Sequence, residues 1–440
     1  MVFIISIYNF VAINYFISEP NQPQKFSIST FYPTILTTMI TDLEQIFSTS
    51  AKNMKRSAIR ELLKLTQKPN IISFAGGLPA PESFPIEQLK EITAEVLEKD
   101  GTQALQYGAT EGDNKLRQIL VDRYRKQGLD IKLENLIITT SSQQGLDLLP
   151  KIFINPGDKI ICGLPSYLGA LQAFNNYGAQ MVGIKLDDKG MRSDLLEQKL
   201  EEMKKNGEKP KFIYIIPDFQ NPAGITMPKS RREEIIKIAH KYDVLIIEDS
   251  PYREVRFEGE HQPTMFQLDN TGHVILLGTF SKIFVPGFRV GWVIGNEAII
   301  DKLVMAKQAT DLCTPPFVQK ISALYLEKGY FDQNLKGIID SYRVKRDAML
   351  NAFRKYMPEG VSWTEPEGGL FLFLTLPEYM DAEELFKIAI EENVAFVLGN
   401  VFHCDGSGRN TMRLNFSYMS KEKNDEGVQR LANAIKKLMK

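Results

Sequence analysis

The chain has 440 residues, a formal net charge of −1 at pH 7 and 43% hydrophobic residues. This length is sufficient for two domains around a large core, and the composition is that of an ordinary soluble protein. Because the charges nearly cancel, the chain lacks the electrostatic signature of a protein that binds nucleic acid or an anionic membrane.

The first 38 residues carry no core pattern. The first eighteen are mostly apolar, and the first charged residue is Glu19. They lack the basic start and cleavage site of a secretory signal, and their length is at the lower limit for spanning a bilayer. Residues 19–38 are rich in Pro, Ser, Thr and Gln, which is typical of an unstructured segment. We interpret residues 1–38 as a disordered leader from an over-long gene start, with a membrane anchor as the alternative.

Between residues 73 and 317, short apolar runs alternate with amphipathic helical stretches. This alternation predicts a mainly parallel sheet covered by helices on both faces. The expected strands are 136–140, 159–162, 181–184, 212–216, 244–248 and 274–279, and the expected helices include 143–154, 195–205 and 229–241. Residues 290–294 follow after too short a connection for a crossover, so they are expected to form an antiparallel neighbour in the same sheet.

After residue 318 the pattern becomes that of a smaller α+β domain. A long helical stretch at 330–356 precedes strand-like runs at 369–374, 394–397 and 412–416, and helices are expected at 381–391 and 423–439. We therefore predict a large domain over residues 73–317 and a small domain over 318–440. Residues 39–72, with a helical segment at 57–65, are expected to pack with the small domain.

The cysteines and histidines show no metal-binding pattern. Cys162, Cys313 and Cys404 are far apart and include no C-x-x-C pair, so neither a disulfide framework nor a zinc site is predicted. The four histidines, at positions 240, 261, 273 and 403, lack ligand spacing. We therefore expect no metal centre.

Three polar segments follow predicted strands before the strongest motif. Residues 141–147 begin a helix, whose free N–H groups and dipole suit an anion. Asn221 lies in an Asn-Pro turn after the run 212–216. Asp249 lies just after the apolar run 244–247, at the sheet edge where α/β proteins hold ligands.

The strongest motif is the run Thr-Phe-Ser-Lys-Ile-Phe-Val-Pro-Gly-Phe-Arg-Val-Gly-Trp at 279–292. Lys282 can form a covalent bond with a carbonyl group. Hydroxyl groups and a planar guanidinium are the side chains that satisfy a phosphate dianion, and Thr279, Ser281 and Arg289 provide them here. Farther along, Arg413 is flanked by apolar residues on a predicted strand. Its charge is costly there unless it is paired, and its fork matches a carboxylate.

The run 279–292 resembles the cofactor-lysine segment of the pyridoxal phosphate-dependent aminotransferases of fold type I (class I/II). Residues 217–224 resemble the Asn-Pro-x-Gly segment of that family, and the matches together span residues 55–440 in the family order. The helical run 57–64 followed by Phe-Ala-Gly-Gly-Leu-Pro at 74–79 is most similar to 2-aminoadipate and related broad-specificity aminotransferases. Family members often carry glycine where this chain has Ser141.

The resemblance implies a seven-stranded large sheet and a site that binds pyridoxal 5′-phosphate. It implies that Lys282 bonds to the cofactor and moves the substrate proton, that Asp249 keeps the pyridine nitrogen protonated, and that Asn221 and Tyr252 contact its phenolic oxygen. By the same resemblance, Tyr167 stacks on the ring, and the phosphate is held by Ser142, Gln143, Thr279, Ser281 and Arg289. In a homodimer, Tyr107 would contact the phosphate of the neighbouring subunit. The residues implied at the substrate are Gly77, Asn221, Arg413 and Arg60, with Arg413 on the α-carboxylate and Arg60 on an acidic side chain.

The implied activity is transfer of an amino group from an L-amino acid to a 2-oxo acid by a ping-pong mechanism. The donors expected are 2-aminoadipate, aromatic and branched-chain amino acids and glutamate, and the expected acceptor is 2-oxoglutarate. We expect a cytoplasmic protein without nucleic-acid or membrane partners. Two alternatives remain open, a lyase or decarboxylase on the same fold and a non-catalytic sensor that binds the cofactor.

Overall fold

The computed structural model describes residues 43–54 and 70–439, so the predictions for residues 1–38, for the helical segment 57–65 and for Arg60 lie outside the described residues. The chain divides into two units, Met1–Lys52 and Asn53–Lys440. Near the end of the first unit are two short helices, α3 (Leu43–Ile46) and α4 (Thr49–Asn53). Every helix in the described ranges is too short or too polar to cross a lipid bilayer.

The second unit contains a large sheet in the order β2-β9-β8-β7-β6-β3-β4-β5. Its strands are β2 (Leu136–Thr140), β3 (Lys159–Leu164), β4 (Gln180–Asp187), β5 (Gly190–Met191), β6 (Phe212–Ile215), β7 (Leu245–Asp249), β8 (Val274–Thr279) and β9 (Val290–Ile294). Strand β9 runs antiparallel between β2 and β8, which confirms the prediction for residues 290–294. The sheet has eight strands where seven were predicted, because β4 turns back to pair with the two-residue strand β5.

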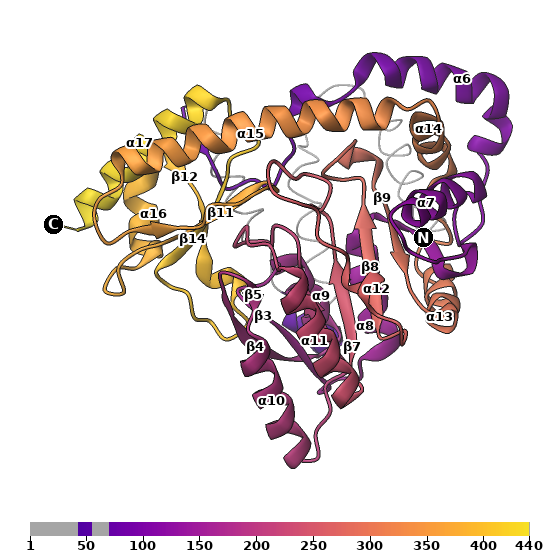
Figure 1. Cartoon of the computed structure of the whole chain (residues 1–440), viewed down its shortest axis with the longest axis horizontal. Coiled ribbons are helices and arrows are strands. Elements are labelled where there is room, and N and C mark those ends of the chain that lie inside the picture. Colours follow the sequence, from indigo (N-terminus) through magenta and orange to yellow (C-terminus); the bar gives the residue numbers. More distant parts are fainter. Residues whose placement is uncertain (1–42, 55–69, 440) are drawn as a thin grey trace, which may run out of the picture. The chain divides into compact units, whose positions relative to one another are not determined.

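Helices cover both faces of this sheet, as predicted, because alternate strand residues point to opposite faces. Ile213 and Ile215 of β6 join one apolar cluster with helices α10 (Ser193–Lys205), α11 (Lys229–Tyr242) and α12 (Met265–Leu268). Phe212 and Tyr214 of the same strand join a second cluster with α8 (Ser141–Phe153) and α9 (Leu168–Asn176). In Figure 1, α10 and α11 extend below the strands, and α8 lies behind them.

The second cluster continues into the carboxy-terminal part of the chain. There, a four-stranded antiparallel sheet has the order β10-β11-β14-β13, and β1 (Ile72–Ser73) pairs with β12 (Val394–Ala395). The strands are β10 (Ser362–Trp363), β11 (Phe371–Thr375), β13 (Val397–Leu398) and β14 (Thr411–Asn415). The predicted run 394–397 is therefore two short strands, β12 and β13, in different sheets.

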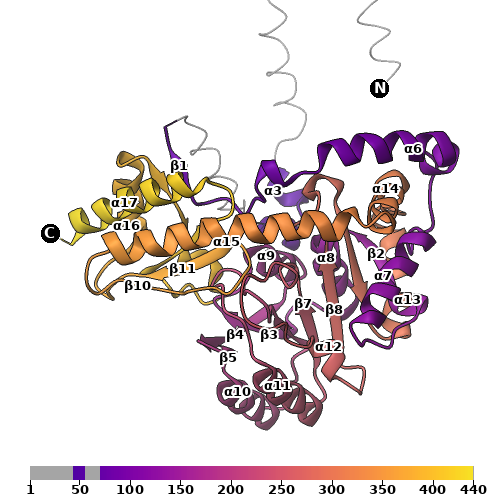
Figure 2. The ribbon, with the colours of Figure 1, turned by 45° about the horizontal axis from the view of Figure 1, so that its top comes forward.

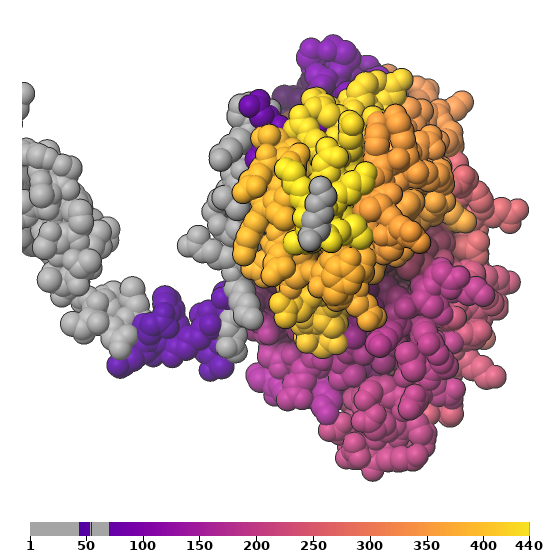
Figure 3. Space-filling view, turned by 90° about the vertical axis from the view of Figure 1, so that its left-hand side faces the viewer, coloured from indigo at the N-terminus to yellow at the C-terminus, as the bar shows by residue number. Residues whose placement is uncertain are grey.

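The remaining helices are α6 (Ile86–Ala104), α7 (Asn114–Lys126), α13 (Glu297–Gln308), α14 (Pro316–Glu327), α15 (Tyr330–Tyr356), α16 (Ala382–Glu391) and α17 (Lys421–Leu438). Helix α15 runs from α14 to the carboxy-terminal sheet, and α17 lies beside it (Figures 1 and 2). Figure 3 shows the yellow carboxy-terminal residues meeting the magenta residues of the large sheet. The boundary predicted at residue 317 remains a proposal.

Polar residues mark the helix starts that position these elements. A side-chain oxygen accepts a hydrogen bond from a backbone N–H of the first turn at Asp113, Thr264, Asn296, Asp381 and Ser420. Such caps satisfy donors that an isolated helix end leaves unpaired.

Candidate active site

A cavity of about 810 Å³ opens at the carboxyl edge of the large sheet. The segments after β2, β3 and β6 and the ends of β7 and β8 all reach this edge, because these five strands run in the same direction. Among its lining residues are Gly77, Ser142, Gln143, Tyr167, Asn221, Asp249, Tyr252, Thr279, Ser281, Lys282, Arg289 and Arg413. The structure thus brings together all the predicted site residues in the described ranges except Tyr107, and Arg60 lies outside those ranges.

Hydroxyl groups and one guanidinium gather where α8 begins. The Thr279 hydroxyl donates to the Ser281 hydroxyl over 2.9 Å, and the Ser141 hydroxyl lies 3.2 Å from the same oxygen. The Arg289 guanidinium donates to Ser281 over 3.4 Å. These groups, with the first N–H groups of α8, form a positive, donor-rich end of the cavity that suits an anion.

The backbone at this end is tight. Ser141 has φ 65°, in the left-handed region that glycine adopts most easily. A Cβ atom placed on Gly291 of β9 would lie 2.6 Å from the backbone of both Ser141 and Ser142. The turn before α8 can therefore rest against β9 only because residue 291 has no side chain.

Asp249, at the end of β7, is almost fully buried and only half satisfied. The Tyr214 hydroxyl donates to its Oδ2 over 2.7 Å. Its Oδ1 is buried without a hydrogen-bond partner in the part of the chain that the structure describes. Burial raises the pKa of Asp249 to about 7, against the opposing effect of the Tyr214 hydrogen bond. The carboxylate can therefore accept a further cationic donor.

Lys282 carries the amine of the site. Its Nζ donates to the carbonyl oxygen of Gly77 over 2.7 Å. Burial, followed by the positive charges of Arg413 and Arg289, lowers the pKa of Lys282 to about 8. A larger fraction of this amine is neutral near pH 7 than of an ordinary lysine, and the neutral amine is the nucleophilic form.

Asn221 links two further predicted residues. Its Nδ2 donates to the Tyr252 hydroxyl over 3.1 Å, and its Oδ1 accepts from Arg413 over 3.1 Å. Arg413 also donates to the Ala75 carbonyl over 3.0 Å, while its Nε is buried without a partner within the described ranges. Burial lowers the pKa of Arg413 to about 10. Burial likewise raises the pKa of Tyr252 above its ordinary value.

Two aromatic rings of the cavity, those of Tyr167 and Phe371, are each contacted by a polar side chain. The Tyr167 hydroxyl donates to Gln143 Oε1 over 3.3 Å, and Gln143 Nε2 donates to the Gly169 carbonyl over 3.0 Å. The Arg413 guanidinium lies 4.2 Å from the centroid of the Phe371 ring, a cation–π contact that covers its apolar face.

The sequence did not predict a hydrogen-bonded group of Lys307, Asp311 and Gln144 that lies behind the start of α8. The fully buried Lys307 side chain donates to Asp311 Oδ1 over 2.7 Å and to Gln144 Oε1 over 2.9 Å. Gln144 Nε2 in turn donates to Asp311 Oδ2 over 2.7 Å. The i,i+4 spacing of Lys307 and Asp311 at the end of α13 is the signal that could have indicated this pair. Asp311 also lines the cavity.

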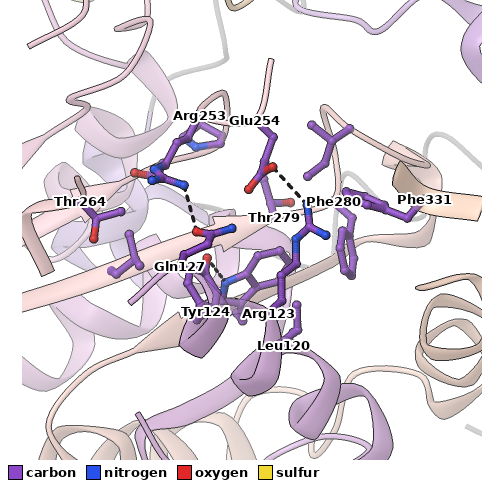
Figure 4. A pocket seen from close by; sticks show the side chains of 15 residues that line it. Leu120, Arg123, Tyr124, Gln127, Arg253, Glu254, Thr264, Thr279, Phe280 and Phe331 are labelled. Carbon is purple, nitrogen blue, oxygen red and sulfur yellow. Dashed lines mark hydrogen bonds and ion pairs between the residues drawn. The ribbon is translucent and has the colours of Figure 1, made fainter. Parts of the chain in front are cut away.

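A second, small cavity of about 30 Å³ adjoins the first and shares Thr279 and Pro251 with it. Figure 4 shows its charged and polar side chains paired with one another, including Arg123 with Glu254 at 3.2 Å and Arg253 with Gln127 at 3.0 Å. This volume has room for about two water molecules, so the cavity cannot hold a substrate.

Tyr107 lies outside the cavity. Its side chain is 78% exposed and is not among the lining residues. Its predicted contact with a neighbouring subunit stays a prediction.

Helices cover both faces of the large sheet, Lys282 follows β8, and Asp249 lies at the carboxyl edge of the sheet. Together these features define a fold type I aminotransferase. The chain belongs to the aminotransferase class I and II family, whose model matches residues 69–431.

Several characterised proteins are similar to this chain. It is 50% identical to aromatic-amino-acid aminotransferase 1 of Thermococcus litoralis over 400 residues, which cover 91% of this chain and 96% of that protein. A kynurenine aminotransferase of Pyrococcus horikoshii, solved in complex with PMP, aligns with a TM-score of 0.88 and 46% identity, covering 92% of this chain and 100% of that one. The alpha-aminoadipate aminotransferase of Thermus thermophilus, solved with N-(5′-phosphopyridoxyl)-L-leucine, aligns with a TM-score of 0.84 and 39% identity, covering 90% and 99%.

Proposed function

We propose that this aminotransferase binds pyridoxal 5′-phosphate and transfers the amino group of an L-amino acid to a 2-oxo acid, most often 2-oxoglutarate. The observation that carries the proposal is the half-satisfied carboxylate of Asp249 in the same cavity as the amine of Lys282 and the donor-rich end at α8. A buried carboxylate oxygen without a donor is costly, and a protonated pyridine nitrogen would satisfy it.

The other parts of the cofactor also fit the chain. The phosphate matches the hydroxyl groups and guanidinium at Ser281, Thr279 and Arg289 and the first N–H groups of α8, where Ser142 and Gln143 lie. The phenolic oxygen matches the hydrogen-bonded pair of Asn221 and Tyr252, both of which line the cavity. When bound, the cofactor withdraws electrons from the α-carbon of the substrate.

The chain's own residues would then divide the work. Arg413 holds the substrate α-carboxylate through its guanidinium, whose Nε has no partner among the residues that the structure describes. The Nζ of Lys282 removes the proton from the substrate α-carbon and later returns a proton, and its lowered pKa suits both roles near pH 7. A positive charge facing Asp249 would favour its ionised form, so this carboxylate would act together with the cofactor.

The reaction proceeds in two halves at this one site. The first 2-oxo acid must leave before the second binds, because both need the same guanidinium of Arg413 and the same amine of Lys282. Ping-pong kinetics follow from this order.

For the donors we propose 2-aminoadipate, aromatic and branched-chain amino acids and glutamate. The relatives named for aromatic amino acids and for alpha-aminoadipate support this choice. We further propose that Arg60 pairs with acidic substrate side chains. If so, Arg60→Gln raises KM for glutamate, 2-oxoglutarate and 2-aminoadipate and leaves KM for leucine and aromatic donors nearly unchanged. Equal effects on both donor classes would reject this role.

We propose a homodimer in which Tyr107 contacts the neighbouring subunit's phosphate. The exposure of Tyr107 in the single chain supports this contact. Sedimentation should give a mass twice that of the chain, and Tyr107→Phe should weaken cofactor binding while leaving the dimer intact.

We also propose a cytoplasmic location. In that reducing compartment Cys162 and Cys404, whose Sγ atoms lie 3.8 Å apart, would stay thiols. Cell fractionation tests this location.

The decisive experiment is a screen of amino donors with 2-oxoglutarate, followed by detection of glutamate and the donor's 2-oxo acid. Lys282→Ala is the matched control, since it removes the amine and leaves the cavity. Formation of ammonia and an oxo acid without any acceptor would instead support a lyase, and release of carbon dioxide a decarboxylase. Tight cofactor binding without turnover of any donor would indicate a sensor.

A further inference from the structure

Two histidines and an aspartate that are separated in sequence converge at the opposite edge of the large sheet. His240 lies in the last turn of α11, Asp269 ends α12, and His273 directly precedes β8. The three side chains can each present one ligand atom, and these atoms all lie within 4.8 Å of one another. The histidine spacing in the sequence predicted no metal centre, because 33 residues separate His240 from His273.

The contacts within this cluster point inward to one place. His240 Nε2 lies 3.0 Å from Asp269 Oδ1. The Thr271 hydroxyl lies 2.7 Å from His240 Nε2, 2.7 Å from His273 Nδ1 and 2.6 Å from Asp269 Oδ1. The Thr271 hydroxyl donates to Asp269 Oδ1, and each ring nitrogen is a donor or an acceptor according to its tautomer. The two ring nitrogens and the carboxylate oxygen therefore face one shared point, which the Thr271 hydroxyl oxygen marks.

A second carboxylate orients one of the rings. Asp243 Oδ1 accepts a hydrogen bond from His273 Nε2 over 3.2 Å, which directs the other ring nitrogen, Nδ1, toward the cluster. A carboxylate on the far nitrogen of a histidine fixes the tautomer and raises the basicity of the nitrogen that binds a metal. The Asp269 side chain is only 2% exposed, whereas His240 and His273 are 28% and 21% exposed, so the cluster is open to solvent on the imidazole side.

We propose that His240, Asp269 and His273 form a binding site for one divalent transition-metal ion, with Zn²⁺ as the best match. Two imidazole nitrogens and one carboxylate oxygen are ligands that Zn²⁺ takes in tetrahedral sites, where water fills the fourth position. Hard cations such as Mg²⁺ prefer oxygen ligands and fit this set poorly.

The site is structural and separate from the catalytic cavity. His273 directly precedes β8, and Thr279 is the last residue of that strand. The two residues therefore lie at opposite edges of the sheet, about 20 Å apart at the rise of an extended strand. A bound ion would join the end of α11 to the turn between α12 and β8. It therefore stabilises this edge of the fold and leaves turnover unchanged.

The competing explanation is a hydrogen-bonded turn that binds no metal. Asp269 accepts from the backbone N–H groups of Thr271 and Val274 over 2.9 Å each, and this alone holds the turn before β8 in place. The experiment must therefore measure metal binding rather than loss of stability in the variants.

The test uses the untagged, cofactor-loaded full chain, treated with a chelator, dialysed and titrated with ZnCl₂ in a calorimeter. We expect one Zn²⁺ per chain at the highest-affinity site. Asp243→Asn should weaken binding about 10- to 100-fold, as expected for the loss of a partner behind a ligand, and His240→Ala and His273→Ala should weaken it more. His261→Ala is the matched control, because His261 lies outside the cluster, and it should leave the affinity unchanged.

Each variant is compared with its own metal-free form, so a variant that is merely less stable still gives an answer. Zn²⁺ should raise the Tm of the wild type and of His261→Ala and should not raise that of His273→Ala. No stoichiometric binding to the wild type would overturn the proposal. Binding that survives His240→Ala with His273→Ala but disappears in Cys162→Ser with Cys404→Ser would also overturn it, because the site would then be the thiol pair.

Discussion

The Tyr214 hydroxyl holds one oxygen of the Asp249 carboxylate at 2.7 Å, while the other oxygen has no partner among the described residues. This asymmetry divides the roles of the two oxygens. Tyr214 fixes the orientation of the carboxylate and favours its charged form, and the remaining oxygen is left for the ligand.

Tyr214→Phe should therefore lower kcat without abolishing it. The loss of one hydrogen bond to a charged group is worth about 1.5–3 kcal/mol, which corresponds to a reduction of roughly 10- to 100-fold if the whole effect falls on the reacting state. KM for the amino donor should change little, because Tyr214 does not line the cavity. Single-turnover measurements check this split, and an equal effect on KM and kcat would mean that Tyr214 only supports the fold.

Asp249 should make the cofactor-free protein less stable as the pH rises. Its folded pKa of about 7 lies above the ordinary value of 3.8, so the folded state retains a proton that the unfolded state has lost. The free energy of unfolding should fall from about pH 4 and level off above about pH 7, by up to roughly 4 kcal/mol.

Asp249→Asn removes this titration, so the difference between the two proteins isolates it. Urea midpoints of both cofactor-free proteins should converge at acid pH, with the wild type falling behind as the pH increases. Parallel curves across this range would show that Asp249 is not held in its neutral form.

Lys282 should control how fast the cofactor-free protein combines with pyridoxal phosphate. The reacting form is the neutral amine, so the rate should increase with pH and level off above about pH 8. Arg413→Gln removes a neighbouring positive charge and should move this plateau to higher pH. Stopped-flow absorbance measures the rate, and Lys282→Ala, which should give a folded protein without the visible band and almost without turnover, is the control. An unmoved plateau in Arg413→Gln would contradict the charge effect.

Arg413→Lys should raise KM for amino donors and 2-oxo acids alike. A lysine keeps the charge but loses the planar pair of donors, at a cost of about 1.5–3 kcal/mol or roughly 10- to 100-fold. Arg409→Lys on the exposed surface, where Arg409 pairs with Asp381, is the control and should be silent. If KM changed for only one substrate class, Arg413 would be reading the side chain instead of the shared carboxylate.

The sequence points to candidate site residues where a short, distinctive segment ends or follows a strand. Lys282, Asp249 and Asn221 were all found in this way, and the cavity brings them together. Tyr214 was missed because a tyrosine inside an apolar strand is more often a core residue. The convergence of His240, Asp269 and His273 could not be read from the sequence, because only the folded turn before β8 brings them within reach of one another.

The fold was predicted least well where elements are short. Strand β5 has two residues, and the run 394–397 divides between two sheets, so neither carries enough periodicity to be recognised. The bounds of longer elements were easier to predict, because their hydrophobic pattern extends over more residues. Strands at 136–140, 274–279 and 290–294 and the helix at 330–356 have the predicted bounds.

Gly291 is a strand residue that contributes no functional group, yet the space above it determines whether the anion-binding turn can exist. A methyl group at this position would push Ser141 and Ser142 away from β9, and the N–H groups of α8 with them. A substitution of Gly291 would therefore weaken cofactor retention while the rest of the sheet stays folded. Its effect would resemble the loss of a ligand-binding residue.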